Sequence, residues 1–119
     1  MTLLIKIDPA PATEPERSTA APERLIAGNP AFATWAQDES MAGSGEVRSG
    51  VWQATPGETH SIKGETCEFC HILDGVVELT EAGKAPVTFR AGDSFVMKPG
   101  FVGVWKTIET VRKIYVVIG

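Results

Sequence analysis

The stretch CEFCHILDGVVEL, residues 67–79, decides the fold class, because strand-forming residues lie on both sides of an Asp-Gly pair at 74–75. An apolar run resumes directly after this pair, which predicts two antiparallel strands joined by a tight turn. Successive side chains of a strand face opposite sides, so Glu68, Cys70 and Ile72 share one face. If that face is the core, the Glu68 carboxylate points into an apolar interior, where it needs a partner, a metal or a raised pKa. Glu68 is therefore the first candidate for chemistry.

From residue 31 onward the chain consists of short apolar segments separated by turn residues, without an apolar repeat at helical spacing. Strands are expected at residues 34–36, 51–54, 59–63, 67–73, 76–80, 87–89, 94–97, 103–108 and 111–118. Short, evenly spaced strands of this kind predict an all-β sandwich or small barrel with Greek-key connections. Prolines at 9, 11, 15 and 22 interrupt the N-terminal segment. We therefore predict an irregular arm over residues 1–27 and a β domain over residues 28–119.

Composition narrows the classes of function. The 119 residues, 43% of them hydrophobic, are enough for one domain with one core. Acidic residues outnumber basic ones by 15 to 11, and no Lys/Arg cluster occurs, so we expect no nucleic-acid partner. Residues 1–8 are interrupted by charge too early for a signal peptide, and no later run is suited to spanning a bilayer. We expect a cytoplasmic protein without a membrane partner, whose two cysteines are reduced.

The turns and strand sequences together resemble the cupin superfamily, whose fold is a double-stranded β-helix, or jelly roll. Gly57, Glu68 and Gly75 fall into the frame of the first cupin motif, and Gly92 and Gly100 into that of the second. Lys98 stands where the second motif usually has proline. More narrowly, the chain is similar to small cupins related to the ethanolamine-utilisation cupin and the ureidoglycine aminohydrolase domains. The segments that carry this similarity are residues 50–58, 67–80, 91–105 and 111–117.

The chain departs from the cupin pattern at the metal ligands. The two histidines of the first motif fall most plausibly on Ser61 and Lys63, and the histidine of the second motif falls on Gly103. Glu68 is the one usual ligand that remains. A transition-metal site needs three or four N, O or S donors around one point, so we expect no tightly bound metal and no cofactor. Lys63 either places its ammonium where the ion would sit, paired with Glu68, or points to solvent.

Cys67, Cys70 and His71 match the attachment pattern for c-type haem. Residues three apart along a strand are separated by roughly 10 Å and face opposite ways, so the two sulfurs are not expected to meet. We interpret both Cys67 and Cys70 as small buried apolar residues rather than redox groups. By the same alternation His71 faces away from Glu68, and His60 faces outward.

Aromatic residues on the expected barrel strands complete a candidate pocket for a small polar ligand, although core packing is the alternative for each ring. Arg112 and Lys113 are consecutive, and the sequence leaves open which of them faces inward. The candidate catalytic residues are Glu68 and Lys63, and the candidate pocket residues are Trp52, Ser61, Cys70, Gly103, Trp105, Arg112 and Tyr115.

Three functions follow from this pattern. The first is a small-molecule-binding cupin without the usual metal ligands, accessory to the metabolism of small amino or carboxylate compounds. The second is a metal-independent enzyme that uses Glu68 as general acid or base. The third is a structural or assembly protein with a vestigial pocket. All three predict a homodimer, because small jelly rolls commonly pack a sheet face against a symmetry mate.

Overall fold

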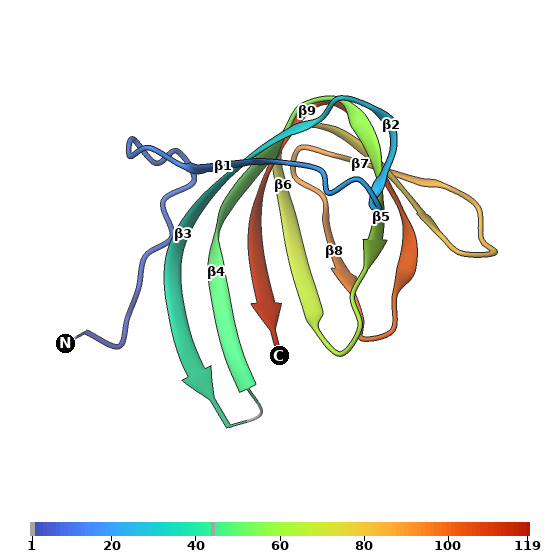
Figure 1. The fold of residues 1–119 in the computed structure, drawn as a ribbon. Helices are drawn as coiled ribbons and strands as arrows, with labels where there is room; N and C mark the ends of the chain where they lie inside the picture. The colour runs from blue at the N-terminus through green and yellow to red at the C-terminus, as the bar shows by residue number, and fades with distance from the viewer. Residues whose placement is uncertain (1, 44) are drawn as a thin grey trace.

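A computed structural model describes residues 2–43 and 45–119 of the chain, and these residues form nine strands (Figure 1). The strands are β1 (Glu16–Thr19), β2 (Leu25–Gly28), β3 (Ala31–Ala42), β4 (Gly45–Ala54), β5 (Gly57–Ile62), β6 (Cys67–Glu81), β7 (Val87–Arg90), β8 (Ser94–Met97) and β9 (Val102–Ile118). The described residues contain no helix that is long and apolar enough to cross a membrane.

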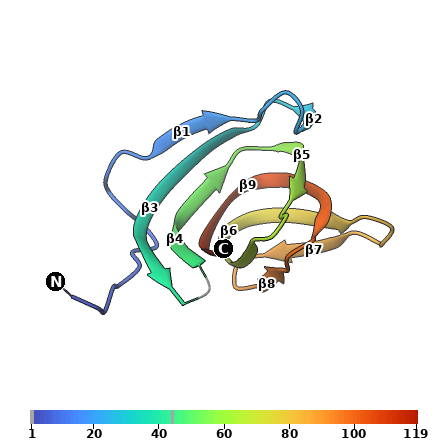
Figure 2. The same ribbon diagram turned by 60° about the horizontal axis from the view of Figure 1, so that its bottom comes forward.

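All strand pairs are antiparallel, and the sheet curls into two layers because β6 and β9 each run through both of them (Figure 2). The C-terminal half of β9 pairs with β4, while its N-terminal half pairs with β5. In the same way β8 pairs with the first half of β6 and β7 with the second half. This arrangement is the antiparallel jelly roll that the resemblance implies.

Residues 67–79 form one continuous strand, so the predicted hairpin is wrong. The two halves of β6 pair with β9 rather than with each other, as the pairs Ile72–Lys113 and Val77–Thr107 show. The register shifts three times between residues 72 and 77, where the Asp-Gly pair lies. Gly75 has a φ of 86°, which suits a bulged bend as well as a tight turn. The bend carries the chain from one layer into the other.

The N-terminal segment contains two short strands, so the prediction of an irregular arm is wrong for residues 16–19 and 25–27. β1 pairs with β3 and β2 pairs with β5, each at an edge of the sheet path. The prolines lie before β1 and between β1 and β2, where they remove no donor from either ladder. The predicted domain boundary between residues 27 and 28 falls within β2.

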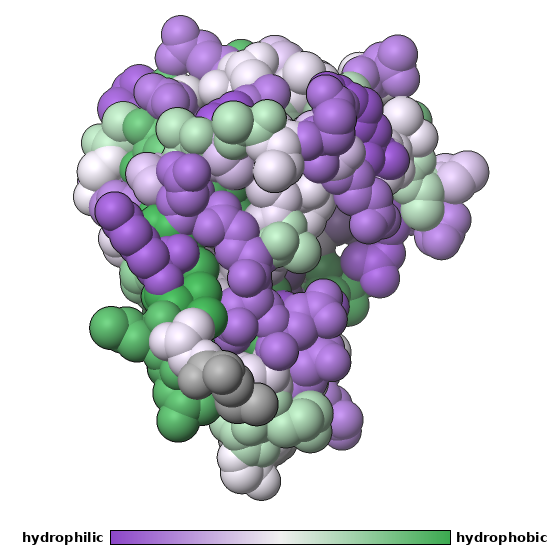
Figure 3. Space-filling view, turned by 90° about the vertical axis from the view of Figure 1, so that its left-hand side faces the viewer, coloured by the Kyte–Doolittle hydropathy of each residue, from purple (hydrophilic) through white to green (hydrophobic). Residues whose placement is uncertain are grey.

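The segment before β1 is attached to β3 through side-chain contacts. The amide of Asp8 donates to Gln37 Oε1 at 2.7 Å, and Gln37 Nε2 donates to the Asp8 carbonyl at 2.8 Å. Trp35 Nε1 donates to the Thr13 carbonyl at 2.8 Å. Figure 3, seen from this side, shows hydrophobic side chains exposed beside hydrophilic ones. Leu3 and Leu4 in this segment are 93% and 85% exposed.

The core lies between the two layers and confirms the predicted alternation along β6. Cys70 and Ile72 are fully buried and Glu68 is 6% exposed, whereas Phe69 on the other face is 40% exposed. The buried apolar cluster comprises Ala54, Cys70, Ile72, Val77, Leu79, Met97, Trp105 and Val111. Glu68 therefore points inward beside this cluster, as the sequence predicts.

The bend in β6 generates the first prediction. A Cβ at Gly75 would clash with the Thr110 carbonyl oxygen of β9, whereas a Cβ at Gly83 would meet no atom within 4 Å. Both glycines have positive φ, 86° and 79°, so an alanine at either position has the same backbone strain of about 1–2 kcal/mol. Gly75→Ala should lower the free energy of unfolding by at least about 2 kcal/mol more than Gly83→Ala. Urea denaturation of both variants measures the difference, and equal losses would contradict the close approach of β6 to β9.

Candidate functional site

A cavity of about 330 Å³ opens between the two layers. Its walls come from β3, β4, β5, β6, β8 and β9 and from the loop after β5. The lining residues are Thr34, Arg48, Trp52, Thr59, Lys63, Glu68, Met97, Trp105, Lys113, Tyr115 and Val117. Charged, hydroxyl and aromatic groups thus meet in one concave site.

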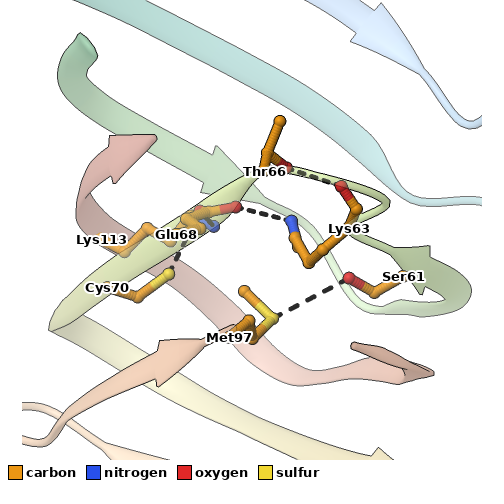
Figure 4. A network of polar contacts seen from close by, with 7 residues as sticks. All are labelled: Ser61, Lys63, Thr66, Glu68, Cys70, Met97 and Lys113. Atoms are coloured by element: carbon orange, nitrogen blue, oxygen red, sulfur yellow. Dashed lines mark hydrogen bonds and ion pairs between the residues drawn. The ribbon is translucent and has the colours of Figure 1, made fainter. Parts of the chain in front are cut away.

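Glu68 is held at both carboxylate oxygens by lysine side chains (Figure 4). Lys63 Nζ donates to Oε1 at 2.7 Å, and Lys113 Nζ donates to Oε2 at 2.6 Å. The thiol of Cys70 also donates to Oε2 at 3.2 Å. The side chains of Glu68, Lys63 and Lys113 are 8%, 17% and 7% exposed, so both ion pairs lie in the interior. Short charge-assisted bonds of this kind are the strong ones in proteins.

Lys113 is the residue that faces inward from the consecutive pair at 112 and 113. Its Nζ lies 4.5 Å from the ring centroid of Trp52 and 4.5 Å from that of Trp105, which are distances typical of cation–π contacts. The two rings meet edge to face with centroids 5.3 Å apart. Trp105 Nε1 donates to Thr107 Oγ1 at 3.0 Å, so its polar edge is satisfied. The aromatic rings and the Glu68 carboxylate together enclose one ammonium group.

Arg112 does not enter the cavity, in contrast to the prediction. Its guanidinium donates to Gln53 Oε1 from Nε at 3.2 Å and from Nη2 at 3.0 Å. It also lies 4.9 Å from the ring centroid of Trp35. Because neighbouring side chains of a strand face opposite sides, the inward position of Lys113 turns Arg112 to the outer face.

The structure brings together five of the predicted site residues in the lining, namely Trp52, Lys63, Glu68, Trp105 and Tyr115. Three others lie beside it. Cys70 is fully buried beneath Glu68, and Ser61 Oγ lies 3.9 Å from Met97 Sδ. Gly103 is paired with Ser61 across β5 and β9, and a Cβ there would clash with the Thr80 carbonyl oxygen.

Sequence reasoning missed part of the lining. The missed residues are Thr34, Arg48, Thr59, Met97 and Val117, and Lys113 was left undecided. Arg48 shares its face of β4 with Trp52, but β4 begins at Gly45, earlier than the strand expected at 51–54. Alternation alone does not choose Lys113, because apolar residues occur on both faces of residues 111–118.

Burial and ion pairing have opposite effects on the Glu68 pKa. Burial alone would raise it, but the Lys113 and Lys63 ammonium groups outweigh burial and lower the pKa from 4.5 to about 2. Burial would lower the pKa of Lys113, but Cys70 and Glu68 beside it raise that pKa above the ordinary lysine value. Mainly through burial, the pKa of Cys70 rises to about 12, so this residue is a neutral thiol. At neutral pH the site therefore holds a carboxylate and an ammonium.

The side chains do not fit a transition-metal site. The positions that match the histidine ligands of the cupin pattern carry Ser61, Lys63 and Gly103, and the Lys63 ammonium lies directly against Glu68. Among residues 2–43 and 45–119, no three His, Cys, Asp or Glu side chains are grouped so that they would hold a metal ion. His60 is exposed, and His71 Nδ1 is 2.7 Å from Ser94 Oγ on the other face of β6. Ammonium groups are not ligands while protonated.

A second, larger cavity of about 600 Å³ lies near β7 and β8. Its lining is mostly apolar and includes Phe89, Phe95 and Phe101. Its charged residues, Glu81, Lys84 and Lys98, are all exposed. Because the buried, ion-paired groups are all in the smaller cavity, the candidate site is placed there despite its size.

The buried ion pairs generate a prediction for stability. Glu68→Gln would leave the Lys113 ammonium buried without a counter-charge, which typically costs about 3–5 kcal/mol. Combining Glu68→Gln with Lys113→Met should restore most of this loss, because the thioether keeps the contacts with the tryptophan rings without a charge. Chemical denaturation of the single and double variants measures the coupling. A loss below about 1 kcal/mol in the single variant would contradict a buried charge cluster.

The lowered Glu68 pKa predicts how stability depends on pH. The unfolded carboxyl titrates near 4.5 and the folded one near 2, so its contribution is complete above about pH 4.5 and disappears as the pH falls toward 2. At about 1.4 kcal/mol per pKa unit, the contribution is on the order of 3 kcal/mol. The Glu68→Gln/Lys113→Met variant should lack this component of acid sensitivity. Denaturation at several pH values compares the two proteins, and identical slopes between pH 4.5 and 2 would contradict the assignment.

Comparisons with known proteins agree with this architecture. No curated protein matches the chain. A solved structure from Pseudomonas syringae pv. tomato, a protein of unknown function in the DUF861 family, is 27% identical with a TM-score of 0.80. The match covers 93% of this chain and 46% of that one, so the chain spans about half the length of that protein.

Two further structures are similar over different shares of the chain. A DUF861 protein from Thermotoga maritima is 32% identical with a TM-score of 0.52, over 55% of this chain and 73% of that one. The EutQ protein of Clostridium difficile shares the fold at 14% identity, with a TM-score of 0.63 over 91% of this chain and 97% of that one. Residues 41–115 match the family described as the EutQ-like cupin domain, and this match includes β4 to β8, most of β9 and the Glu68 cluster. The chain therefore belongs to the EutQ-like cupin domain family.

Proposed function

We propose that this cupin binds a small organic molecule in the cavity at Glu68, without a metal ion. The observation that carries the proposal is the Lys63–Glu68–Lys113 cluster, which lies in the cavity and includes positions that match metal ligands in the cupin pattern. Ligand sites are typically concave, with aromatic walls and a few fixed polar groups. This cavity likewise has aromatic walls and a few charged groups fixed by ion pairs, and we propose an accessory role in small-metabolite metabolism for it.

Catalysis with Glu68 as general acid or base receives less support. An efficient acid or base has a pKa near the working pH, whereas the pKa of Glu68 is about 2. At neutral pH this carboxylate has no proton to donate, and its two oxygens already accept bonds from ammonium groups. Its role in the proposed function is to fix the positions of Lys63 and Lys113.

A homodimer is a further part of the proposal. It is supported by exposed apolar side chains, above all Leu3, Leu4 and Met41, the last of which is 76% exposed near the end of β3. Isolated apolar residues are normal on a surface, so the size of the assembly has to be measured directly. Light scattering should give twice the mass of 12.7 kDa, and a monomer at micromolar concentration would contradict this part.

The binding proposal is tested on protein that has been treated with a chelator and checked by elemental analysis. A thermal-shift screen against small metabolites should give ligands that raise the melting temperature of this metal-free protein. Their effect should be lost in Lys63→Gln and kept in Lys106→Gln, because Lys106 is paired with Glu58 outside the cavity. Stabilisation that requires a stoichiometric metal ion, or equal loss in both variants, would contradict the proposal.

A further inference from the structure

We propose that the ligand of this cavity is a small carboxylate anion rather than an amine or a neutral molecule. This inference rests on the proposed binding function and names the class of ligand. It follows from the balance of charge in the cavity, from the pairing of Glu68 with two lysines and from the donors that remain available.

The lining carries more positive than negative charge. Arg48, Lys63 and Lys113 are cations, and Glu68 is the one acidic residue among the lining residues. One carboxylate neutralises one of these charges, so a surplus remains beside the aromatic rings. Electrostatic attraction in a partly enclosed site is stronger than in bulk water, because the surrounding protein has a lower dielectric constant. An anion bound there would complete the neutralisation.

Arg48 forms an ion pair with Glu46 outside the cavity, but this pair does not remove the surplus of positive charge in the lining. Its Nε lies 3.1 Å from Glu46 Oε1, with side chains 42% and 47% exposed. Ion pairs at this exposure contribute little and are screened by solvent. Glu46 does not line the cavity, whereas Arg48 does. The arginine therefore remains a source of positive potential in the lining.

For an amine ligand, Glu68 is a poor partner, because this carboxylate is already paired with two ammonium groups. Oε1 of Glu68 accepts a bond from Lys63, and Oε2 accepts bonds from Lys113 and Cys70. A ligand ammonium at Glu68 would lie beside the ammonium groups of Lys63 and Lys113. Like charges at this separation repel one another, so the arrangement selects against amines.

Lys63 is the cation best placed to contact a ligand. Lys113 is enclosed by Trp52, Trp105 and Glu68, whereas Lys63 comes from the loop between β5 and β6 and is the more exposed of the two lysines (Figure 4). An ammonium has three N–H donors, and the bond to Glu68 uses one of them. The remaining donors are available for a ligand carboxylate.

Hydroxyl groups in the lining add neutral hydrogen-bond donors. Thr34, Thr59 and Tyr115 all line the cavity. The pKa of Tyr115 is raised, mainly through burial. Its phenol therefore keeps its proton at neutral pH and can donate a hydrogen bond to a ligand. The exposed parts of Trp52 and Trp105 offer an apolar surface to the remainder of the ligand.

The test uses metal-free full-length protein and matched sets of probes that differ in charge. Benzoate, benzamide and benzylamine form an aromatic set, and propionate, propionamide and propylamine form an aliphatic one. Binding is measured by tryptophan fluorescence and by calorimetry. The better-bound carboxylate should bind about tenfold to a hundredfold more tightly than its amide, because it gains a charge-assisted hydrogen bond. The amine should bind most weakly, and added salt should weaken carboxylate binding.

Variants assign the effect to the cavity. Lys63→Gln and, separately, Arg48→Gln should each weaken carboxylate binding and leave the amide nearly unchanged, whereas Lys106→Gln should change neither. Unfolding curves of each variant show whether the fold is kept, and Arg48→Gln remains informative if Lys63→Gln unfolds.

The outcomes separate the two proposals. If an amide or an amine binds as tightly as its carboxylate, the assignment of an anionic ligand is overturned while the binding function stands. If neither these probes nor the metabolite screen gives any binding to the cavity, both proposals are overturned. Carboxylate binding that is insensitive to Lys63→Gln and Arg48→Gln in folded protein also overturns the assignment.

Discussion

The site depends on one buried carboxylate shared by two ammonium groups. Glu68 and Lys113 lie on strands that pair directly, and Lys63 comes from the loop that leads into β6. A buried charge is tolerated when it is paired and hydrogen-bonded, and removing one partner is costly. The alternation of β6 and β9 turns Glu68 and Lys113 into the interior, and the tryptophan rings enclose the Lys113 ammonium. The charged groups of the cavity are held in place by the two ion pairs of Glu68.

A fixed ammonium differs from a metal ion in what it does for a ligand. A metal exchanges ligands and lowers the pKa of bound water, whereas a lysine provides only charge and N–H donors. Lys63 lies at a position that matches a metal ligand in the cupin pattern, and its contact with Glu68 is an ion pair rather than a coordination bond. The residues of this site are therefore suited to holding and orienting a molecule more than to activating water. The same reasoning favours binding over hydrolysis.

Much of the fold, and the inward carboxylate, could be predicted from the sequence. Short apolar segments separated by turn residues indicated an all-β chain. Alternation placed Glu68 with Cys70 and Ile72, because it is a local property of a strand. The prediction of a hairpin was wrong because an Asp-Gly pair suits a turn and a bulge equally. Which of the two forms depends on pairing with β9, which lies about thirty-five residues further along the chain. Local sequence was also not enough to predict that Lys113, rather than Arg112, faces the interior. That prediction required the cross-strand contacts with Trp52 and Glu68, which only the assembled sheet provides.

Two strands, β6 and β9, belong to both layers of the domain. Layers joined by continuous backbone cannot move apart as independent bodies, because β6 and β9 connect them at the bend. In the proposed function, the ligand would therefore have to fit a cavity whose two walls are tied together by the same pair of strands. On this proposal, the backbone would limit the size of an accepted ligand, and the side chains would select its charge.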